Sequence, residues 1–288
     1  MKELAEYLHR EMPRSPSTSL ASKVAVIAIT AILYAMAKAV TSFIPTPWGV
    51  GQLLIGIFVP AFLAVVANTL SVAIGAGLGT FLGDTFFLTP AGSTNPALSL
   101  IAGVPANFIA FLLFGWFVKK YRSWPAFVAA TVSFVTLGNL IAAANLVLFG
   151  AAVFTPLVAL VATFNLAALI LGFTVFWAST MIPAILIAVP LLVRAVKPLQ
   201  GRSSILADYP SWSDAGARNR LGVSVVLSIA LLALGAVFFL AAPSTAAIFP
   251  GFTTYLVITV VSVLIIGPIV GVIAGSRMAG ERNGSKNF

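Results

Sequence analysis

Basic residues stand in four short clusters along this chain, and long apolar stretches separate the clusters. Fifteen of the sixteen Lys and Arg residues belong to them: Lys2, Arg10, Arg14 and Lys23; Lys119, Lys120 and Arg122; the five basic residues of 194–220; and Arg277, Arg282 and Lys286. In polytopic membrane proteins, short loops rich in Lys and Arg stay on the cytoplasmic side. The pattern therefore predicts a polytopic membrane protein whose basic loops share one side of the bilayer.

The composition excludes several classes of protein. Hydrophobic residues make up 60% of the chain and charged residues only 8%, whereas soluble domains carry about a quarter charged residues. The basic residues behind the net charge of +9 flank apolar stretches, so membrane orientation explains them better than nucleic-acid binding does. The chain has no Cys, and its one His is His9. Disulfides and thiolate ligands are therefore excluded, and zinc chemistry is disfavoured.

Spanning helices of roughly 20 apolar residues can be placed by parity: two basic clusters on the same side of the bilayer must be separated by an even number of crossings. Residues 52–82 are best divided into two spans near Asn68, because four crossings then return the chain to the basic side at Lys119. Two crossings within 154–193 would put the next basic cluster outside, so we expect a re-entrant or outer-leaflet segment at 154–173. The other predicted spans are 23–44, 98–118, 124–149, 176–193, 221–240 and 252–275.

These spans predict an all-α protein of about eight spans in the cell membrane, with both termini cytoplasmic. The stretch 199–220 is rich in Ser, Asp, Gly and Arg and is typical of a linker. Apolar residues of the N-terminal tail have helical spacing, which suits an interfacial helix or a solvated one equally. The predicted organisation is a cytoplasmic tail 1–22, a six-span domain 23–198, a cytoplasmic linker 199–220, a two-span hairpin 221–276 and a basic tail 277–288.

Small residues recur at four-residue spacing on three predicted spans, and such ridges let helix backbones approach closely in lipid. For the ridges Gly75/Gly79/Gly83 and Gly267/Gly271/Gly275, packing within the chain is the favoured interpretation. The alanine ridge fits packing within the chain or a partner-docking surface about equally. It consists of Ala31, Ala35 and Ala39.

Two charged residues interrupt the apolar stretches. Asp84 is the only acidic residue of the membrane region, and a carboxylate at that depth is a candidate functional group. It could equally be an interfacial carboxylate that caps the outer loop. Lys38 is the only basic residue outside the clusters, and snorkelling toward the outer surface is the favoured interpretation. If Lys38 pairs with Asp84, the outer halves of the first and third spans are held together.

Asparagines supply uncharged polar groups at membrane depth. Each one alone is best explained as joining helices, since an unpaired amide in hydrocarbon is costly. Together, without a chain of acids or histidines, they favour a neutral polar solute over a proton relay. Trp48 in an outer loop could sit in the interfacial aromatic belt or stack on a planar ligand. The asparagines are Asn68, Asn107, Asn139, Asn145 and Asn165, and the polar outer loops add Thr46, Gln52, Thr89, Ser93, Thr94 and Asn95.

Residues 23–198 resemble the substrate-binding (S) components of energy-coupling factor (ECF) vitamin transporters. The stretch AITAILYAMAKAV (28–40) is similar to the family's first helix, which carries an AxxxA motif. The stretches QLLIGIFVPAFLAVVANTLSVAIGAGLGTFLGD (52–84), NPALSLIAGVPANFIAFLLFGW (95–116) and MIPAILIAVPLLVRAVKP (181–198) are similar to its second and third, fourth and sixth helices. The chain departs from the family in the hairpin 221–275 and in the long apolar segment 154–173.

The resemblance implies a six-helix membrane protein that binds a vitamin-like solute from outside. It also implies docking on an ECF coupling transmembrane subunit driven by two ATPase subunits. Ala31 and Ala35 would carry the family's docking surface, which Ala39 extends. Ligand contacts would come from the regions around 48–52 and 84–107. From these regions and from the membrane asparagines, the candidate substrate-binding residues are Trp48, Gln52, Asp84, Asn95, Asn107 and Asn139.

The predicted function is a membrane-embedded substrate-binding subunit for uptake of a vitamin-like or other small neutral solute. ATP hydrolysis would fall to partner subunits, because the chain carries no GxxxxGK[ST] loop. The alternative is a stand-alone facilitator or channel, in which the extra hairpin replaces helices of a partner. An intramembrane enzyme is disfavoured, since one acid without His or Cys gives poor means for proton transfer. No cofactor or metal is expected.

Overall fold

The chain folds as an all-α membrane protein over the residues that the computed structural model describes, which are 19–42, 46, 51–86, 95–199, 210, 222, 224–231, 233, 265, 267–269 and 272–273. Four helices within this part are long and apolar enough to cross a membrane: Leu20–Thr41, Pro96–Tyr121, Trp124–Ala152 and Leu166–Ala195. Most of the predicted N-terminal tail and of the linker, and all of the C-terminal tail, lie outside the described residues.

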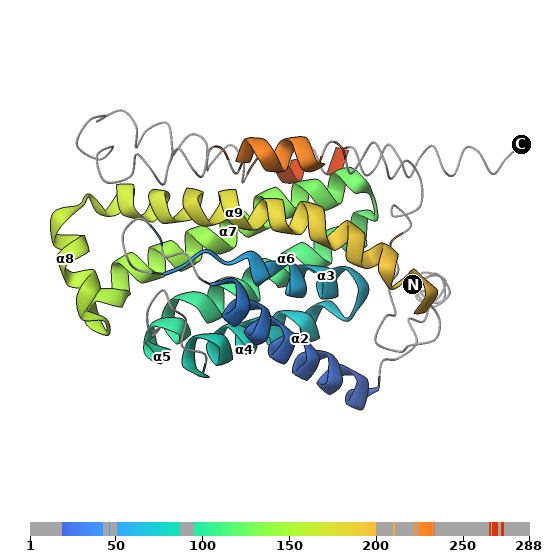
Figure 1. Cartoon of the computed structure of the whole chain (residues 1–288), viewed down its shortest axis with the longest axis horizontal. Coiled ribbons are helices and arrows are strands. Elements are labelled where there is room, and N and C mark those ends of the chain that lie inside the picture. The colour runs from blue at the N-terminus through green and yellow to red at the C-terminus, as the bar shows by residue number, and fades with distance from the viewer. Residues whose placement is uncertain are drawn as a thin grey trace, which may run out of the picture.

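The helices pack side by side (Figure 1), and the order of their contacts closes a ring. A short helix, α3, closes the ring between α9 and α2 and also reaches inward to contact α6 and α4. In order, the ring consists of α2 (Leu20–Thr41), α4 (Thr69–Phe86), α6 (Val104–Tyr121), α7 (Trp124–Phe149), α9 (Leu166–Ala195) and α3 (Phe58–Val66).

Polar side chains define where the helices begin and end. Ser19 and Ser123 accept backbone N–H groups in the first turns of α2 and α7, and such caps satisfy donors that have no partner within the helix. Asn68 breaks the apolar stretch between α3 and α4 and accepts from the backbone N–H of Ser71 at 3.0 Å. Lys119 donates to the carbonyl of Ala67 at the end of α3. The predicted break near Asn68 is therefore confirmed, whereas α3, with nine residues, is too short to be the spanning helix predicted before the break.

The basic residues of the ring other than Lys38 gather at one end of it, which we call the basic end. There Lys23 lies in the first turn of α2, Lys119 and Lys120 lie in the last turn of α6 with Arg122 just after it, and Arg194 lies in the last turn of α9. The contact between Lys119 and the end of α3 places α3 at this end as well. The charged residues at the other end are Lys38 and Asp84, within the described part of the chain.

The glycine ridge of α4 lets α2 and α4 approach closely. A Cβ atom added at Gly75 would lie 2.6 Å from Cβ of Thr30, and one added at Gly79 would lie 2.8 Å from the carbonyl oxygen of Ala31. Only glycine leaves room for α2 at these two positions, so the predicted packing role of this ridge is confirmed. The small residues take the place of a hydrophobic driving force that is absent between helices in lipid.

The segment 154–173 differs in detail from the prediction. It forms a short helix, α8 (Thr155–Thr163), followed by the first turns of α9, which is one helix of 30 residues with Pro183 and Pro190 inside it. At about 1.5 Å per residue, the nine residues of α8 cannot cross a bilayer. α8 joins the ends of α7 and α9 at the left of Figure 1 and adds no crossing, as parity required. The expected start of the sixth span at residue 176 is wrong.

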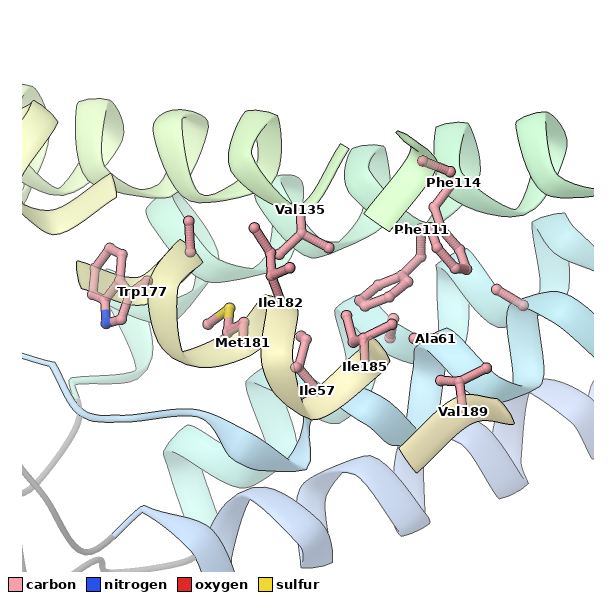
Figure 2. Packing of buried hydrophobic residues seen from close by; sticks show 14 of the residues in the cluster. Ile57, Ala61, Phe111, Phe114, Val135, Trp177, Met181, Ile182, Ile185 and Val189 are labelled. Carbon is pink, nitrogen blue, oxygen red and sulfur yellow. The ribbon is translucent and has the colours of Figure 1, made fainter. Parts of the chain in front are cut away.

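Large apolar side chains fill the ring toward the basic end (Figure 2). Phe114 and Phe127 are completely buried and meet edge to face, with ring centroids 6.2 Å apart. α3 lies mostly buried among them, and its nine residues make it only about 14 Å long. Because α3 is so short, it fills one half of the ring and leaves the other half to the irregular residues 51–54.

Parts of the predicted C-terminal hairpin are described, and they contact the ring. Leu227, Leu231 and Val272 pack against its apolar core, and Gly267 lies against Ser133 of α7. Gly271 and Gly275 of the third ridge lie outside the described residues. The described part of the hairpin thus packs against the ring, and against α7 in particular.

Candidate binding site

A cavity of about 130 Å³ lies inside the ring at the end opposite the basic residues. A single water molecule needs about 10–15 Å³ of such space, so the cavity has room for a small organic molecule. The long helices of the ring contribute to its wall, through the later turns of α2, α4 and α7 and the earlier turns of α6 and α9. The irregular segment at Gly51 and Gln52 completes the wall. We call this half of the ring the cavity end.

A buried ion pair stands in the cavity wall. Lys38 of α2 bonds to Oδ1 of Asp84 of α4, and Ser99 Oγ donates to the other carboxylate oxygen at 2.6 Å. Lys38 and Asp84 are only 4% and 8% exposed, so each charge needs the other to offset its desolvation. Gly83 leaves space for the stem of Lys38, whose Cδ would lie 3.0 Å from a Cβ at that position. The favoured prediction that Lys38 snorkels outward is wrong, and the alternative pairing is found.

A π-helical turn, Ser99–Gly103, brings Ser99 to the ion pair. Such turns are rare and are frequent at functional sites. The turn joins α5 (Pro96–Leu98) to α6. Asn145 of α7 donates to the carbonyl of Ile101 at 3.0 Å, which stabilises the widened turn. Gly103 allows the turn to lie on α4, since a Cβ there would be 2.7 Å from Cγ2 of Thr80.

A polar layer lies beside the ion pair. Asn107 Nδ2 donates to Thr80 Oγ1 at 2.8 Å, and Thr80 donates in turn to the carbonyl of Ala76 at 2.8 Å. The fully buried Tyr34 faces this pair from α2. Asn107 and Thr80 both line the cavity. The bond from Asn107 to Thr80 ties α6 to α4 beside the cavity.

Asn139 of α7 is the exception among these polar groups. It lines the cavity and is only 5% exposed. Its amide nitrogen is buried and has no hydrogen-bond partner. One residue before it, Gly138 seats α7 closely on α6, because a Cβ there would lie 2.7 Å from Cβ of Ala110. Asn139 is therefore held at the cavity by tight packing rather than by its own hydrogen bonds.

Trp177 of α9 is the part of the wall that holds the irregular segment at Gly51 and Gln52. Its indole nitrogen donates to the carbonyl of Gln52 at 3.1 Å, and its ring stacks on Phe173 with centroids 5.2 Å apart. Gly51 has φ of 77° and lies so close that a Cβ would be 2.9 Å from the Trp177 ring. This left-handed conformation and close approach both require glycine. The irregular segment is thereby fastened to α9.

The predicted substrate-binding residues largely come together. Gln52, Asp84, Asn95, Asn107 and Asn139 all line the cavity. Asn95 faces it while also capping α5 and donating to the carbonyl of Val153 at 2.7 Å. Asn68, Asn145 and Asn165 instead cap or join helices. Trp48, Thr89, Ser93 and Thr94 lie outside the described residues.

Sequence reasoning missed three residues of the wall. Ser99 and Thr80 gave no signal, because single hydroxyl residues are common in membrane helices and usually bond to their own backbone. Trp177 stands in a largely apolar stretch, where an aromatic side chain is most simply explained as part of the apolar core. The Pro-rich irregularity at 45–51 could have indicated that a loop enters the ring near Gln52, since Pro and Gly mark breaks in helices.

The alanine ridge is not available as predicted. Ala31 and Ala35 are 4% and 2% exposed and lie against the glycines of α4, while Ala39 is half-buried. The face of α2 that carries Ala31 and Ala35 is already covered within the chain. The prediction that these two residues form a free docking surface is therefore wrong, and close backbone approach to α4 explains their small size.

The cavity does not continue through the ring. Beyond Ile57, Phe111 and Met181, which line it, the space between the helices is filled by α3 and by buried side chains such as Phe114, Ile185 and Val189. Figure 2 shows this order along α9, with Trp177 and Met181 toward one end of the row and Val189 at the other. The apolar floor makes the cavity blind.

Within the described residues, no group of three His, Cys, Asp or Glu side chains could hold a metal ion. The arrangement offers hydrogen bonding and apolar contact to a small molecule. Comparisons with protein-family models, curated proteins and solved structures find no match to this chain.

Proposed function

We propose that this chain is the membrane-embedded binding subunit of an uptake system, and that its cavity takes up a small, vitamin-like neutral solute from outside. The observation that carries the proposal is the blind cavity at the end of the ring opposite the basic residues. Lys- and Arg-rich ends face the cytoplasm in polytopic proteins, so the cavity end would face outward. A site with a closed floor suits capture of a solute rather than its free passage.

ATP-coupled transport through partner subunits fits this chain best. The sequence offers no nucleotide-binding loop of its own, and the resemblance of 23–198 to ECF S components supplies a partner type: a coupling transmembrane subunit and two ATPases. Since Ala31 and Ala35 are covered by α4, the coupling subunit would have to contact another surface. The alternative, a stand-alone facilitator, draws support from the hairpin residues that pack against the ring.

Cysteine labelling in intact cells tests the orientation, and the chain contains no native Cys to remove. Thr155 begins α8 at the cavity end, and Arg122 ends α6 at the basic end; both are exposed. A membrane-impermeant maleimide should label Thr155→Cys in intact cells. It should label Arg122→Cys only after permeabilisation. Labelling of Arg122→Cys from outside would overturn the proposal.

The solute can be identified from the purified chain. Small molecules released from protein in mild detergent should include one compound, detected by mass spectrometry, that Ala142→Leu abolishes. Ala142 lines the cavity, whereas Ala144, on the same helix, does not. Ala144→Leu is thus a matched control and should retain the compound. Loss of the compound from both variants, or from neither, would contradict binding in this cavity.

Liposomes that contain only this chain distinguish an ATP-coupled binding subunit from a stand-alone facilitator. With the identified compound, a binding subunit should give saturable binding without ATP-independent flux. Flux in these liposomes, abolished by Ala142→Leu, would favour the stand-alone facilitator. Affinity purification from the native membrane should recover two ATPases and a coupling protein if ATP drives the uptake. Consistent recovery of the chain alone would count against that coupling.

A further inference from the structure

The polar groups around the cavity differ in whether the protein already satisfies them. Both carboxylate oxygens of Asp84 are bonded, one by Lys38 and one by Ser99. The indole N–H of Trp177 is bonded to Gln52. The amide nitrogens of Asn95 and Asn107 donate to Val153 and Thr80. Among the described residues that line the cavity, Asn139 is the one whose buried polar atom lacks a partner.

A buried donor without a partner is rare in proteins, because it gives up its bond to water and gains nothing in return. In a membrane helix the cost is harder to avoid, since lipid offers no acceptor. Asn139 is nevertheless held in place by Gly138, which fixes α7 on α6. The geometry points to an acceptor that arrives with the ligand.

The charges around the cavity limit what that ligand can be. The ion pair contributes one positive and one negative charge, and each is paired with the other. An anionic or cationic ligand would therefore find no unpaired counter-charge in the described wall, and burying it would be costly. Much of the remaining wall is apolar, with Phe111, Leu146, Phe154, Trp177 and Met181 among its members.

We infer that the cavity selects a compact, uncharged ligand whose carbonyl oxygen or ring nitrogen accepts a hydrogen bond from Asn139 Nδ2, with an apolar ring against Trp177 and Phe111. This inference rests on the proposed binding function and adds the chemical class of the solute. Cyclic amides, imides and ureides belong to this class. Asn139 is the residue that distinguishes such a ligand from an apolar molecule of the same shape.

Four probes of similar shape test the inference on the purified full-length chain in detergent. Benzamide is neutral and carries an acceptor, benzoate is its anionic analogue, benzamidinium is its cationic analogue, and ethylbenzene lacks an acceptor. Dissociation constants can be measured by ligand-observed NMR. Benzamide should bind about tenfold more tightly than each of the other three, the effect of one satisfied hydrogen bond or one avoided charge burial. Tighter binding of benzoate or benzamidinium would overturn the inference.

Two asparagine variants separate ligand recognition from folding. Asn139→Leu should remove the preference for benzamide over ethylbenzene while the midpoint of thermal unfolding stays the same or rises, because no protein bond is lost. Asn145→Leu, on the same helix, removes the bond to Ile101, so it should lower the midpoint and keep the preference. If Asn139→Leu keeps the preference, or lowers the midpoint as Asn145→Leu does, Asn139 has a structural role and the inference fails.

Failure of the inference can be told apart from failure of the proposed function. If a charged probe binds more tightly than benzamide and Ala142→Leu abolishes that binding, only the chemical class is overturned and a binding cavity remains. Absence of binding for all four probes, together with no compound lost from Ala142→Leu, would remove both. Selective benzamide binding by a chain that labels in the opposite orientation would keep the inference and overturn uptake from outside.

Discussion

The two ends of the helix ring are built from different side chains. At the basic end, aromatic residues meet edge to face: the rings of Phe114 and Phe127 are 6.2 Å apart, and those of Phe117 and Phe134 are 5.5 Å apart. At the cavity end, the same helices carry small or polar residues, such as Gly138 and Ala142 of α7. One helix bundle therefore combines a packed half with a hollow half.

This difference shows how a membrane protein can keep a polar cavity. Burial of apolar side chains gives little energy between helices in lipid, so packing and hydrogen bonds must hold the bundle together. The filled half supplies the packing. At the cavity end, the pair Lys38–Asp84 and the bond from Asn107 to Thr80 join α2, α4 and α6. The cavity can stay open because polar bonds, rather than filled space, fix its walls.

The largest effect is expected from breaking the ion pair. Lys38→Met and Asp84→Asn should each lower the free energy of unfolding by about 3–5 kcal/mol, because each leaves a buried charge without its partner. The double variant should recover most of the loss, since no charge remains. Unfolding can be followed by steric trapping or by thermal denaturation in detergent. Additive losses in the double variant would show that the cavity end does not depend on this pair.

A somewhat smaller loss is expected from opening the packed half. Phe114→Ala should cost about 3 kcal/mol, because the fully buried ring leaves a void that its neighbours cannot fill. Ligand binding at the cavity end should persist at temperatures where the variant stays folded. The matched control is Phe108→Ala, on the same helix but only half-buried, which should cost clearly less. Equal losses would mean that the two halves are not packed differently.

The contact between α2 and α4 should be sensitive to single methyl groups. Gly79→Ala should destabilise by about 1–3 kcal/mol, because its Cβ would lie 2.8 Å from the carbonyl oxygen of Ala31. Gly77→Ala, on the opposite side of α4, places its Cβ at an ordinary 3.4 Å from Val104 and should be close to neutral. Similar unfolding midpoints for the two variants would argue against close approach at the ridge.

The smallest effect is expected at the exposed surface of the basic end. Lys120 lies over the ring of Trp116 at 4.8 Å, and both side chains are exposed. Cation–π contacts at exposed sites contribute little, on the order of 0.5 kcal/mol, so Lys120→Gln should leave the unfolding midpoint nearly unchanged. A loss comparable to that of Phe114→Ala would show that this residue contributes to the packed half.

Much of the helix order could be predicted from the sequence, because charge and apolar length determine where a chain can cross lipid. The break near Asn68 and the absence of an extra crossing at 154–173 follow from parity. The length of α9 could not be predicted this way. Pro183 and Pro190 suggest breaks, yet neighbouring groups in membrane proteins can satisfy the backbone that a proline frees, and the helix continues through both.

The candidate site could be predicted in part. Polar residues in apolar stretches are expensive, so Asp84, Asn107 and Asn139 stood out, and all three line the cavity. Which polar groups satisfy one another depends on helix rotation, which composition does not reveal. Asn145 joins a π-helical turn, whereas Asn139 keeps an unpartnered amide. The prediction of a docking surface at the alanine ridge failed for the same reason, since a small-residue motif does not indicate which helix will pack against it.

The short α3 has a consequence for speed. Because α3 lies beneath the floor of the cavity, a solute taken up through this cavity, as the proposed function requires, could leave on the far side only after helices shift. Such rearrangements take on the order of microseconds to milliseconds or longer. The transport rate would then be set by how often the protein changes conformation, with one solute molecule per cycle. It would reach a maximum however steep the solute gradient becomes.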